Sequence, residues 1–369
     1  MSTQAERGPA ERGPAEPSPE EIAARVRTEI DRAIQRNIKG LDFLATVKQP
    51  VGAMAKDTLL RRGTLQLYHY RPVVSEVYRT PILIVSPTSN RGYVFDLTRG
   101  QSLVEFLLTR GYDVYMIDWL APRRDESGLK LEDYLLDFIP MCLACVREIS
   151  GEEKASLLGY CIGGTLSLLT AALFPERIAN LVLFTTPVDF RHMALFRMWG
   201  DQKHFDVDRL VDALGNIPGE FLLQAFDLMR PANRTAGMLN LWVNMWNDDY
   251  VKSYRMFDRW AAETLPLAGE YFRQSTKEFL WRNSIMTGEL VIGGQRVDLK
   301  KITVPVLSVV AQHDHVVPQP AAHPIMELVG SAEREELMVK GGHVSVVAGP
   351  GAVTRLWPTL DKWLAKRSV

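Results

Sequence analysis

The fold is indicated by one stretch of the sequence, Leu157-Leu158-Gly159-Tyr160-Cys161-Ile162-Gly163-Gly164-Thr165. A short apolar run from Ala155 to Leu158 leads into a cysteine flanked by glycines, and apolar residues at helical spacing follow at once. This order predicts a strand, a sharp turn and a helix, with the thiol of Cys161 at the apex. Such a turn has little room for side chains two positions before and after its apex, where Gly159 and Gly163 stand.

The position of Cys161 suits a nucleophile. The first N–H groups of the following helix point at the apex and carry partial positive charge, which favours a thiolate and any oxyanion formed beside it. A cysteine at the end of a buried strand is, on the other hand, usually a packing group. The presence of an acid and a base elsewhere in the chain decides between the two interpretations.

An acid and a base follow in the order that an α/β-hydrolase sheet requires. The predicted strand 306–310 is followed by a loop that contains Asp314, and the predicted strand 337–339 is followed by a loop that contains His343. Because the carboxyl ends of parallel strands meet at one edge of a sheet, we expect both side chains to lie beside Cys161. His343 is then the general base, and Asp314 holds its tautomer.

Each of these groups also has a structural interpretation. Asp314 could be a turn residue before Pro318, and His343 could be a loop histidine with satisfied hydrogen bonds. His313 and His315 compete for the role of base, but they share the loop of the acid and lie too close to it in sequence. The order of nucleophile, acid and histidine favours the catalytic interpretation of all three groups together.

Backbone N–H groups near the thiol are predicted to stabilise the oxyanion of the reaction. One is the N–H of Ile162, the residue after the nucleophile, and the other comes from the loop that follows the strand 82–85. In that loop Ser89 or Asn90 is the candidate donor, since Pro87 has no N–H.

Short apolar segments alternate with helical segments from Leu65 to the carboxyl end. Repeated units of this kind predict a mainly parallel, doubly wound sheet with helices on both faces, and with the triad order they indicate an α/β-hydrolase fold with a helical cap. We expect strands at 65–70, 82–85, 114–117, 155–158, 181–184, 306–310 and 337–339, and helices at 102–109 and 131–149.

The sequence predicts five segments. They are a disordered low-complexity tail (1–20), an N-terminal helical segment (21–64), the first part of the α/β-hydrolase core (65–185), a helical cap or lid (186–301) and the second part of the core (302–369). The tail repeats Ala-Glu-Arg-Gly-Pro, a composition that buries too little apolar surface to fold. Ser18 caps the helix that follows, and its apolar residues suit packing on the core or on a partner chain.

The predicted cap is rich in Trp, Met and Phe. We expect most of these side chains to form a core of the cap itself. A cap inserted between core strands normally also covers an active site, and a flexible Met and aromatic lining suits an apolar substrate.

Composition excludes several classes of function. The chain has 369 residues, 46% of them hydrophobic, and a net charge of -1, so no basic field indicates a nucleic-acid partner. Its three cysteines make no disulfide framework, and Cys142 and Cys145 lack a second pair at metal-ligand spacing, so we expect them to pack and expect no metal. No apolar run approaches the roughly 18 to 20 residues of a membrane span. These features predict a cytoplasmic protein.

Five motifs together resemble the catalytic subunit of polyhydroxyalkanoate synthases, from about residue 40 to the carboxyl end. The short length resembles the two-component types III and IV, which need a smaller partner subunit. On this resemblance the nucleophile, acid and base of the family fall on Cys161, Asp314 and His343. The motifs are Gly159-Tyr160-Cys161-Ile162-Gly163-Gly164-Thr165, Asp118-Trp119, Gly215-Asn216-Ile217-Pro218, Asp314-His315-x-x-Pro318 and Gly342-His343-Val344-Ser345.

The resemblance implies an acyltransferase that polymerises (R)-3-hydroxyacyl-coenzyme A, above all 3-hydroxybutyryl-coenzyme A, and releases coenzyme A. It implies no cofactor beyond this thioester substrate. The implied partners are the growing polyester and its granule surface, a small subunit of the PhaE or PhaR type, and a second copy in a homodimer, located in the cytoplasm at polyhydroxyalkanoate granules. Asp314 would either orient His343 or act directly on the incoming hydroxyl.

Two other readings of the same residues remain. A cysteine-dependent polyester depolymerase or thioesterase would carry the same turn, triad and cap. A non-catalytic granule-coating protein would keep only the fold, although the complete set of Cys161, Asp314 and His343 speaks against it.

Overall fold

The computed structural model describes residues 18–45, 51–229 and 231–368. These residues form two compact units. The smaller unit comprises the described residues up to 45 together with 235–254, and the larger unit comprises those from 51 to 234 and from 255 to 368.

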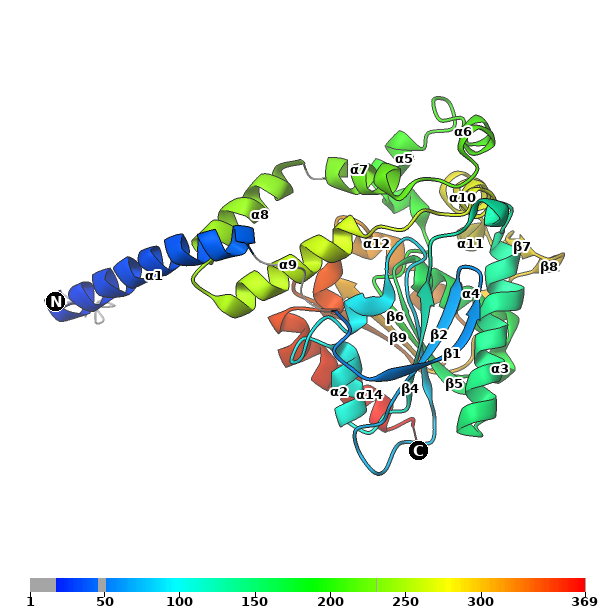
Figure 1. The fold of residues 1–369 in the computed structure, drawn as a ribbon. Helices are drawn as coiled ribbons and strands as arrows, with labels where there is room; N and C mark the ends of the chain where they lie inside the picture. Colours follow the sequence, from blue (N-terminus) through cyan, green and yellow to red (C-terminus); the bar gives the residue numbers. More distant parts are fainter. Residues whose placement is uncertain (1–17, 46–50, 230, 369) are drawn as a thin grey trace, which may run out of the picture. The chain divides into compact units, whose positions relative to one another are not determined.

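An eight-stranded sheet forms the centre of the larger unit, in the order β1-β2-β4-β3-β5-β6-β9-β10 among the described residues (Figure 1). Within this sheet, strands β4, β3, β5, β6, β9 and β10 are parallel to one another, whereas β2 is antiparallel to both β1 and β4. The strands are β1 Lys56–Arg62, β2 Leu65–Tyr70, β3 Ile82–Val85, β4 Val114–Trp119, β5 Ala155–Tyr160, β6 Ile178–Phe184, β9 Val306–Ala311 and β10 Arg334–Val339.

Helices cover both faces of this sheet, as predicted (Figure 1). Helices α3 (Ile139–Ser150) and α4 (Ile162–Leu173) pack on one face, and α2 (Leu103–Thr109) and α14 (Trp357–Ala365) pack on the other. The side chain of Ser102 accepts a 2.9 Å hydrogen bond from Glu105 N–H and so caps α2. The predicted α/β-hydrolase architecture is therefore confirmed.

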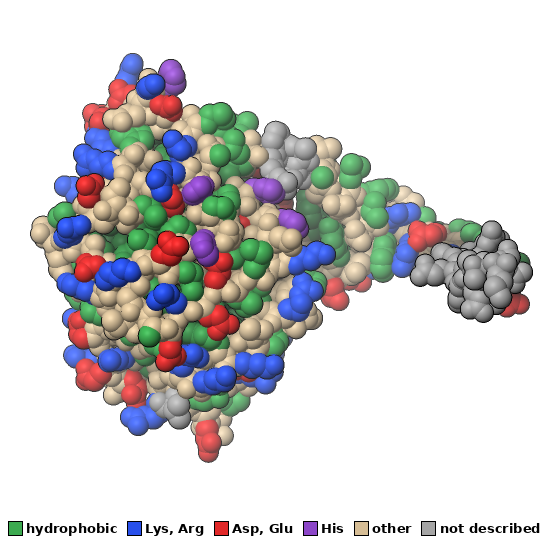
Figure 2. Space-filling model, turned by 180° about the vertical axis from the view of Figure 1, so that it is seen from behind, with side chains coloured by type: hydrophobic (Ala, Val, Ile, Leu, Met, Phe, Trp, Pro, Cys, Tyr) green, Lys and Arg blue, Asp and Glu red, His purple; other side chains and the backbone are tan. Residues whose placement is uncertain are grey.

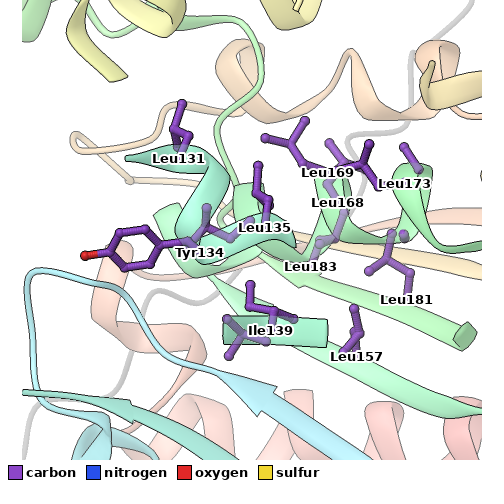
Figure 3. Close-up of a cluster of buried hydrophobic side chains, with 14 of the residues drawn as sticks. Leu131, Tyr134, Leu135, Ile139, Leu157, Leu168, Leu169, Leu173, Leu181 and Leu183 are labelled. Atoms are coloured by element: carbon purple, nitrogen blue, oxygen red, sulfur yellow. The ribbon is translucent and has the colours of Figure 1, made fainter. Parts of the chain in front are cut away.

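Buried apolar side chains fill the space between the sheet and each helical layer. Along β3, Leu83 and Val85 join the cluster under α3 and α4, whereas Ile82 and Ile84 join the cluster under α2 and α14. Figure 3 shows leucines of α4, β5 and β6 gathered in the first cluster. Since both faces of such a strand are buried, its sequence is apolar throughout and does not alternate between apolar and polar residues. Each fully buried leucine contributes roughly 1.5 to 3 kcal/mol to stability.

The prediction of a helical segment over 21–64 is wrong for its last part, because Lys56–Arg62 forms the edge strand β1. Only Leu59 and Leu60 of this strand are apolar, and most of its other side chains are exposed. Such a strand is held by backbone hydrogen bonds to β2, so its sequence carries no periodic apolar pattern.

Helix α1 (Pro19–Ala45) dominates the smaller unit, and it begins as the sequence predicts. Ser18 N–H donates to Glu21, and Glu21 N–H donates to the Ser18 hydroxyl, which is a reciprocal cap. Lys39 Nζ donates to Trp246 O at 3.1 Å and pairs with Asp248 at 2.7 Å, so α1 packs within this unit against the segment around residue 246. Five apolar side chains of α1 remain about half exposed: Ile22, Val26, Ile30, Ile34 and Ile38. Residues 1–17 of the predicted tail (1–20) lie outside the described residues, and the prediction is wrong for Pro19 and Glu20, which form the first turn of α1.

The chain between β6 and β9 is mainly helical. Its longer helices are α6 Val207–Leu214, α7 Gly219–Met229, α8 Pro231–Val243, α9 Asp248–Ala262 and α10 Gly269–Ser275. Shorter elements are α5 Ala194–Trp199, α11 Ser284–Thr287 and the strands β7 Val291–Ile292 and β8 Gln295–Arg296. Phe205, Phe272 and Trp281 pack in a small core of their own, whereas Phe221 is 40% exposed. The expected aromatic core therefore takes up only part of the aromatic residues.

Short helical segments of three to six residues complete the larger unit. They are α12 Gln319–Ala322, α13 Ile325–Leu328, η1 Gly92–Phe95, η2 Arg124–Glu126, η3 Asp133–Phe138, η4 Pro175–Arg177, η5 Phe190–His192, η6 Thr276–Trp281, η7 Leu299–Lys301, η8 His343–Val346 and η9 Ala352–Leu356.

On the face drawn in Figure 2, acidic and basic side chains are interspersed, in keeping with the net charge of -1.

Substitution of Gly163 by alanine is expected to destabilise this fold strongly. A methyl group there would overlap the carbonyl oxygens of Val85 and Ser86, and backbone on both sides leaves it no room. We expect the free energy of unfolding in urea to fall by about 3 kcal/mol or more. Gly128→Ala is the matched control, since its added methyl group meets no atom within 4 Å, and it should change the same quantity by about 1 kcal/mol or less. Equal effects of the two variants would contradict the packing described here.

Candidate active site

Cys161 lies at the apex of a strained turn between β5 and α4, where the sequence predicts it. Its φ is 54° and its ψ is -127°, a conformation that costs a residue with a side chain about 1 to 3 kcal/mol. Its N–H donates to Phe184 O at 3.0 Å, which fixes the turn to the neighbouring strand β6. Gly159 and Gly163 allow the close approach, because a Cβ at either position would overlap neighbouring backbone. The thiol is thus held at the carboxyl edge of the sheet.

Asp314 and His343 meet at this same edge, on the loops after β9 and β10. His343 Nδ1 and Asp314 Oδ2 are 2.7 Å apart, and the Asp314 carboxylate is fully buried. The other carboxylate oxygen, Oδ1, accepts the N–H groups of Val316 and Val317, each at 2.8 Å. Both oxygens are thereby fixed, so the aspartate determines the orientation of the imidazole ring.

His343 also interacts with Cys161, which completes the arrangement of three groups. Burial alone would lower the pKa of His343, but the charge of Cys161 and hydrogen bonds to Asp314 and Cys161 raise it to about 10. The ring of Tyr160 lies against His343, with the two ring centres 5.0 Å apart. The site therefore favours a protonated His343 imidazole beside the sulfur of Cys161.

The two competing histidines lie elsewhere on the acid's loop. His313 and His315 are exposed, whereas Asp314 between them is buried. Sequence analysis missed Tyr160, although its place directly before the nucleophile could have indicated a contact with the base.

The predicted oxyanion donors are the backbone N–H of Ile162 and one N–H from the loop that follows β3. Among the described residues, no group accepts a hydrogen bond from the backbone N–H of Ile162, nor from those of Thr88 and Ser89. The N–H of Asn90 donates to Pro87 O at 3.4 Å, so the Asn90 backbone is already engaged. Ile162 and Ser89 thus remain candidates, and Thr88, which sequence analysis passed over, joins them.

The other cysteines have a packing role. Cys142 is buried in α3, and burial raises the pKa of its thiol, while Cys145 is partly exposed on the same helix. Among the described residues, no three side chains of His, Cys, Asp or Glu are arranged to hold a metal ion. In the same part of the chain no helix is both long and apolar enough to cross a membrane.

Comparisons with known proteins agree with this geometry. The family model described as alpha/beta hydrolase fold matches residues 94–350. A putative lipase from Sulfolobus solfataricus has a similar structure, with 16% identity, a TM-score of 0.57 and coverage of 87% of this chain and 98% of that one. A thermophilic esterase from Thermogutta terrifontis has 16% identity, a TM-score of 0.51 and coverage of 86% and 99%. The chain is therefore an α/β-hydrolase fold protein.

Sequence relatives define the family within this class. Residues 45–107 match the model described as the amino terminus of poly-beta-hydroxybutyrate polymerase (PhaC). The poly(3-hydroxyalkanoate) polymerase subunit PhaC of Allochromatium vinosum is 38% identical over 86% of this chain and 90% of its own length. The subunit of the same name from Synechocystis is 33% identical over 90% and 91%. The chain belongs to the poly(3-hydroxyalkanoate) polymerase subunit PhaC family, whose members are acyltransferase enzymes.

The protonation of His343 should depend on Cys161. In the wild-type protein, the imidazole should keep its second proton up to about pH 10, because the interactions with Cys161 and Asp314 outweigh burial. In Cys161→Ala the midpoint should move down toward the ordinary value near 6.5, because Asp314 alone then opposes burial. The titration is followed by NMR of labelled histidine, with His343→Ala identifying its signal among the 7 histidines. An unchanged midpoint in Cys161→Ala would show that Cys161 does not raise the pKa of His343.

Proposed function

We propose that this chain polymerises (R)-3-hydroxyacyl-coenzyme A, with 3-hydroxybutyryl-coenzyme A as the main substrate, through a thioester on Cys161. Membership of the polymerase family supports the reaction. The observation that carries the mechanism is the contact of His343 with Asp314 at 2.7 Å on one side and with Cys161 on the other. This is the arrangement of an activated nucleophile, its base and an orienting acid.

In the acylation step, the Cys161 thiolate attacks the thioester carbonyl of the substrate while His343 holds the proton that left the thiol. The N–H groups of Ile162 and Ser89 donate hydrogen bonds to the oxyanion that forms. Collapse of this intermediate breaks the bond to coenzyme A sulfur, and the proton of His343 passes to that leaving thiolate. One thioester is exchanged for another, so the acyl group stays activated.

In the elongation step, the 3-hydroxyl of a second acyl group attacks the thioester on Cys161. His343 accepts the hydroxyl proton, an ester bond forms, and the departing Cys161 thiolate is restored beside the imidazolium. Asp314 serves both steps by orienting the ring. This role is favoured over direct action on the hydroxyl, because both carboxylate oxygens are already bonded.

The proposal extends to partners. The relatives are named polymerase subunits, which supports a requirement for a smaller second subunit. We further propose a homodimer and a location at the surface of polyester granules, where the growing chain accumulates. No cofactor is proposed.

Purified protein should release coenzyme A from 3-hydroxybutyryl-coenzyme A and turn the solution turbid with insoluble polyester. Cys161→Ala should lower the rate of release by at least about a thousandfold, because a residue that forms the covalent intermediate cannot be replaced by a methyl group. Coenzyme A release and turbidity are followed with and without the partner subunit.

Cys145→Ala is the matched control, since it removes a partly exposed thiol outside the site, and it should retain the wild-type rate. Release of coenzyme A with free 3-hydroxybutyrate and no polymer would replace the proposal by a thioesterase. Release that survives in Cys161→Ala would refute the covalent mechanism.

A further inference from the structure

The loop over residues 86–92, which carries the candidate second oxyanion donor, is held to the sheet only at its two ends. At its start, Ser86 Oγ donates to Ile117 O at 2.8 Å, and Trp119 Nε1 donates to Ser86 O at 2.9 Å. At its end, the Asp118 carboxylate accepts the N–H of Gly92 at 2.6 Å and the guanidinium of Arg91 at 2.8 Å. The motif Asp118-Trp119 thus anchors both ends of the loop.

The middle of the loop is held by a different part of the chain, the cap segment 260–271. Leu265 N–H donates to Ser89 O at 2.7 Å, and Trp260 Nε1 donates to Arg91 O at 2.8 Å. Thr88 Oγ1 donates to the Tyr271 hydroxyl at 3.2 Å. Hydrogen bonds with the cap therefore involve Thr88 and Ser89 between the two anchors, and Arg91 at the end anchor.

These contacts are shielded from water, which increases their influence on the loop. Thr88 is 5% exposed, Tyr271 2% and Trp260 8%. Burial raises the pKa of Tyr271 to about 12, so its hydroxyl stays neutral at any ordinary assay pH. Without this partner, the hydroxyl of Thr88 would be left buried and unpaired.

The cap segment is itself fixed by the motif Gly215-Asn216-Ile217-Pro218. Ile217 and Leu267 exchange two backbone hydrogen bonds, of 2.8 and 3.0 Å. A Cβ at Gly269 would overlap the carbonyl oxygen of Gly215, so the two segments touch along their backbones. Asn216 Nδ2 donates to Arg123 O at 2.8 Å, beyond the end of β4. The motif therefore connects the cap segment to the segment that follows β4.

We propose that Tyr271 and Trp260 are positioning residues of the reaction, which act through the loop to place the backbone N–H of Ser89 at the oxyanion. This inference rests on the proposed acylation of Cys161. It follows that the oxyanion site is complete only while the cap segment lies on the loop, so an acyl group on Cys161 is poorly activated when the segment moves away. Water can enter the site when the cap segment has moved away, but the incomplete oxyanion site does not accelerate hydrolysis of the acyl group on Cys161.

The test compares two reactions of the same thiol in Tyr271→Phe and Thr88→Val. Acylation by 3-hydroxybutyryl-coenzyme A and by p-nitrophenyl acetate passes through an oxyanion, whereas alkylation by iodoacetamide does not. We expect the first-turnover acylation rate to fall by about tenfold to a hundredfold, less than the 10² to 10³ typical of deleting a donor outright. The alkylation rate should stay within about twofold of wild type, and KM should change little, because the substrate still binds.

Three controls separate positioning from general damage. Thr88→Ser keeps the hydroxyl and should recover most of the acylation rate that Thr88→Val loses, and the double variant of Tyr271→Phe with Thr88→Val should lose no more than either single variant. Tyr112→Phe removes a buried hydroxyl that bonds to Asp361, far along the chain, and should leave acylation unchanged. Trp260→Phe should lower acylation, whereas Trp281→Phe, which removes a cap hydrogen bond to Gly200 O, should not.

An unchanged acylation rate in Tyr271→Phe and Thr88→Val would overturn the inference. An equal loss in the acylation and alkylation rates would also overturn it, because the damage would then lie at the thiol and imidazole. Both rates are measured on folded protein, so a variant with a lower melting temperature remains informative. Failure of the proposed function looks different. The wild-type protein would then acylate from p-nitrophenyl acetate but not from the coenzyme A thioester, and the loop variants would still be compared on the ester.

Discussion

The strained turn at Cys161 is the constraint on which the site depends. A positive φ at a residue with a side chain persists only where the surrounding structure fixes it. Here β5 lies between β3 and β6 in the interior of the sheet, and the Cys161 N–H is bonded to β6. The first turn of α4 meanwhile presses on the backbone that follows β3. The thiol therefore cannot relax without disturbing the middle of the sheet.

This rigid placement explains why three distant parts of the sequence act together. Asp314 and His343 follow adjacent parallel strands, β9 and β10, so their loops leave the sheet at the edge where the turn presents the thiol. The buried carboxylate is stabilised by two backbone N–H groups and by the imidazole. With both oxygens engaged, the carboxylate holds the imidazole ring in one orientation beside Cys161.

The loop over 86–92 is the point at which the cap and the core act on the same chemistry. Its ends are hydrogen-bonded to Asp118 and Trp119 of β4. The loop is also hydrogen-bonded to the cap residues Trp260, Leu265 and Tyr271. The proposed thioester on Cys161 must be reactive toward a hydroxyl yet survive between additions of monomer. The proposed dependence of the oxyanion site on the cap would make the intermediate reactive only while the cap segment lies on the loop.

The sequence by itself determined the parts of this protein that rest on local pattern. Glycine spacing around Cys161 and the apolar strands of the buried sheet are visible in the chain because each reflects a steric or burial requirement at its own position. The order of Cys161, Asp314 and His343 is visible for a related reason, since parallel strands bring successive loops to one edge. Edge strand β1 was not predicted, because it is held by backbone hydrogen bonds, which require no particular pattern of side chains.

Only the tertiary structure decided which groups around the thiol are free and which are engaged. Ser89 and Asn90 are equivalent candidates in the sequence, but a turn to Pro87 takes up the N–H of Asn90 and leaves that of Ser89. The contact of Thr88 with Tyr271 joins residues 183 positions apart and has no periodic signature. Hydrogen bonds between distant loops depend on how the cap folds back on the core, and no short stretch of sequence contains that information.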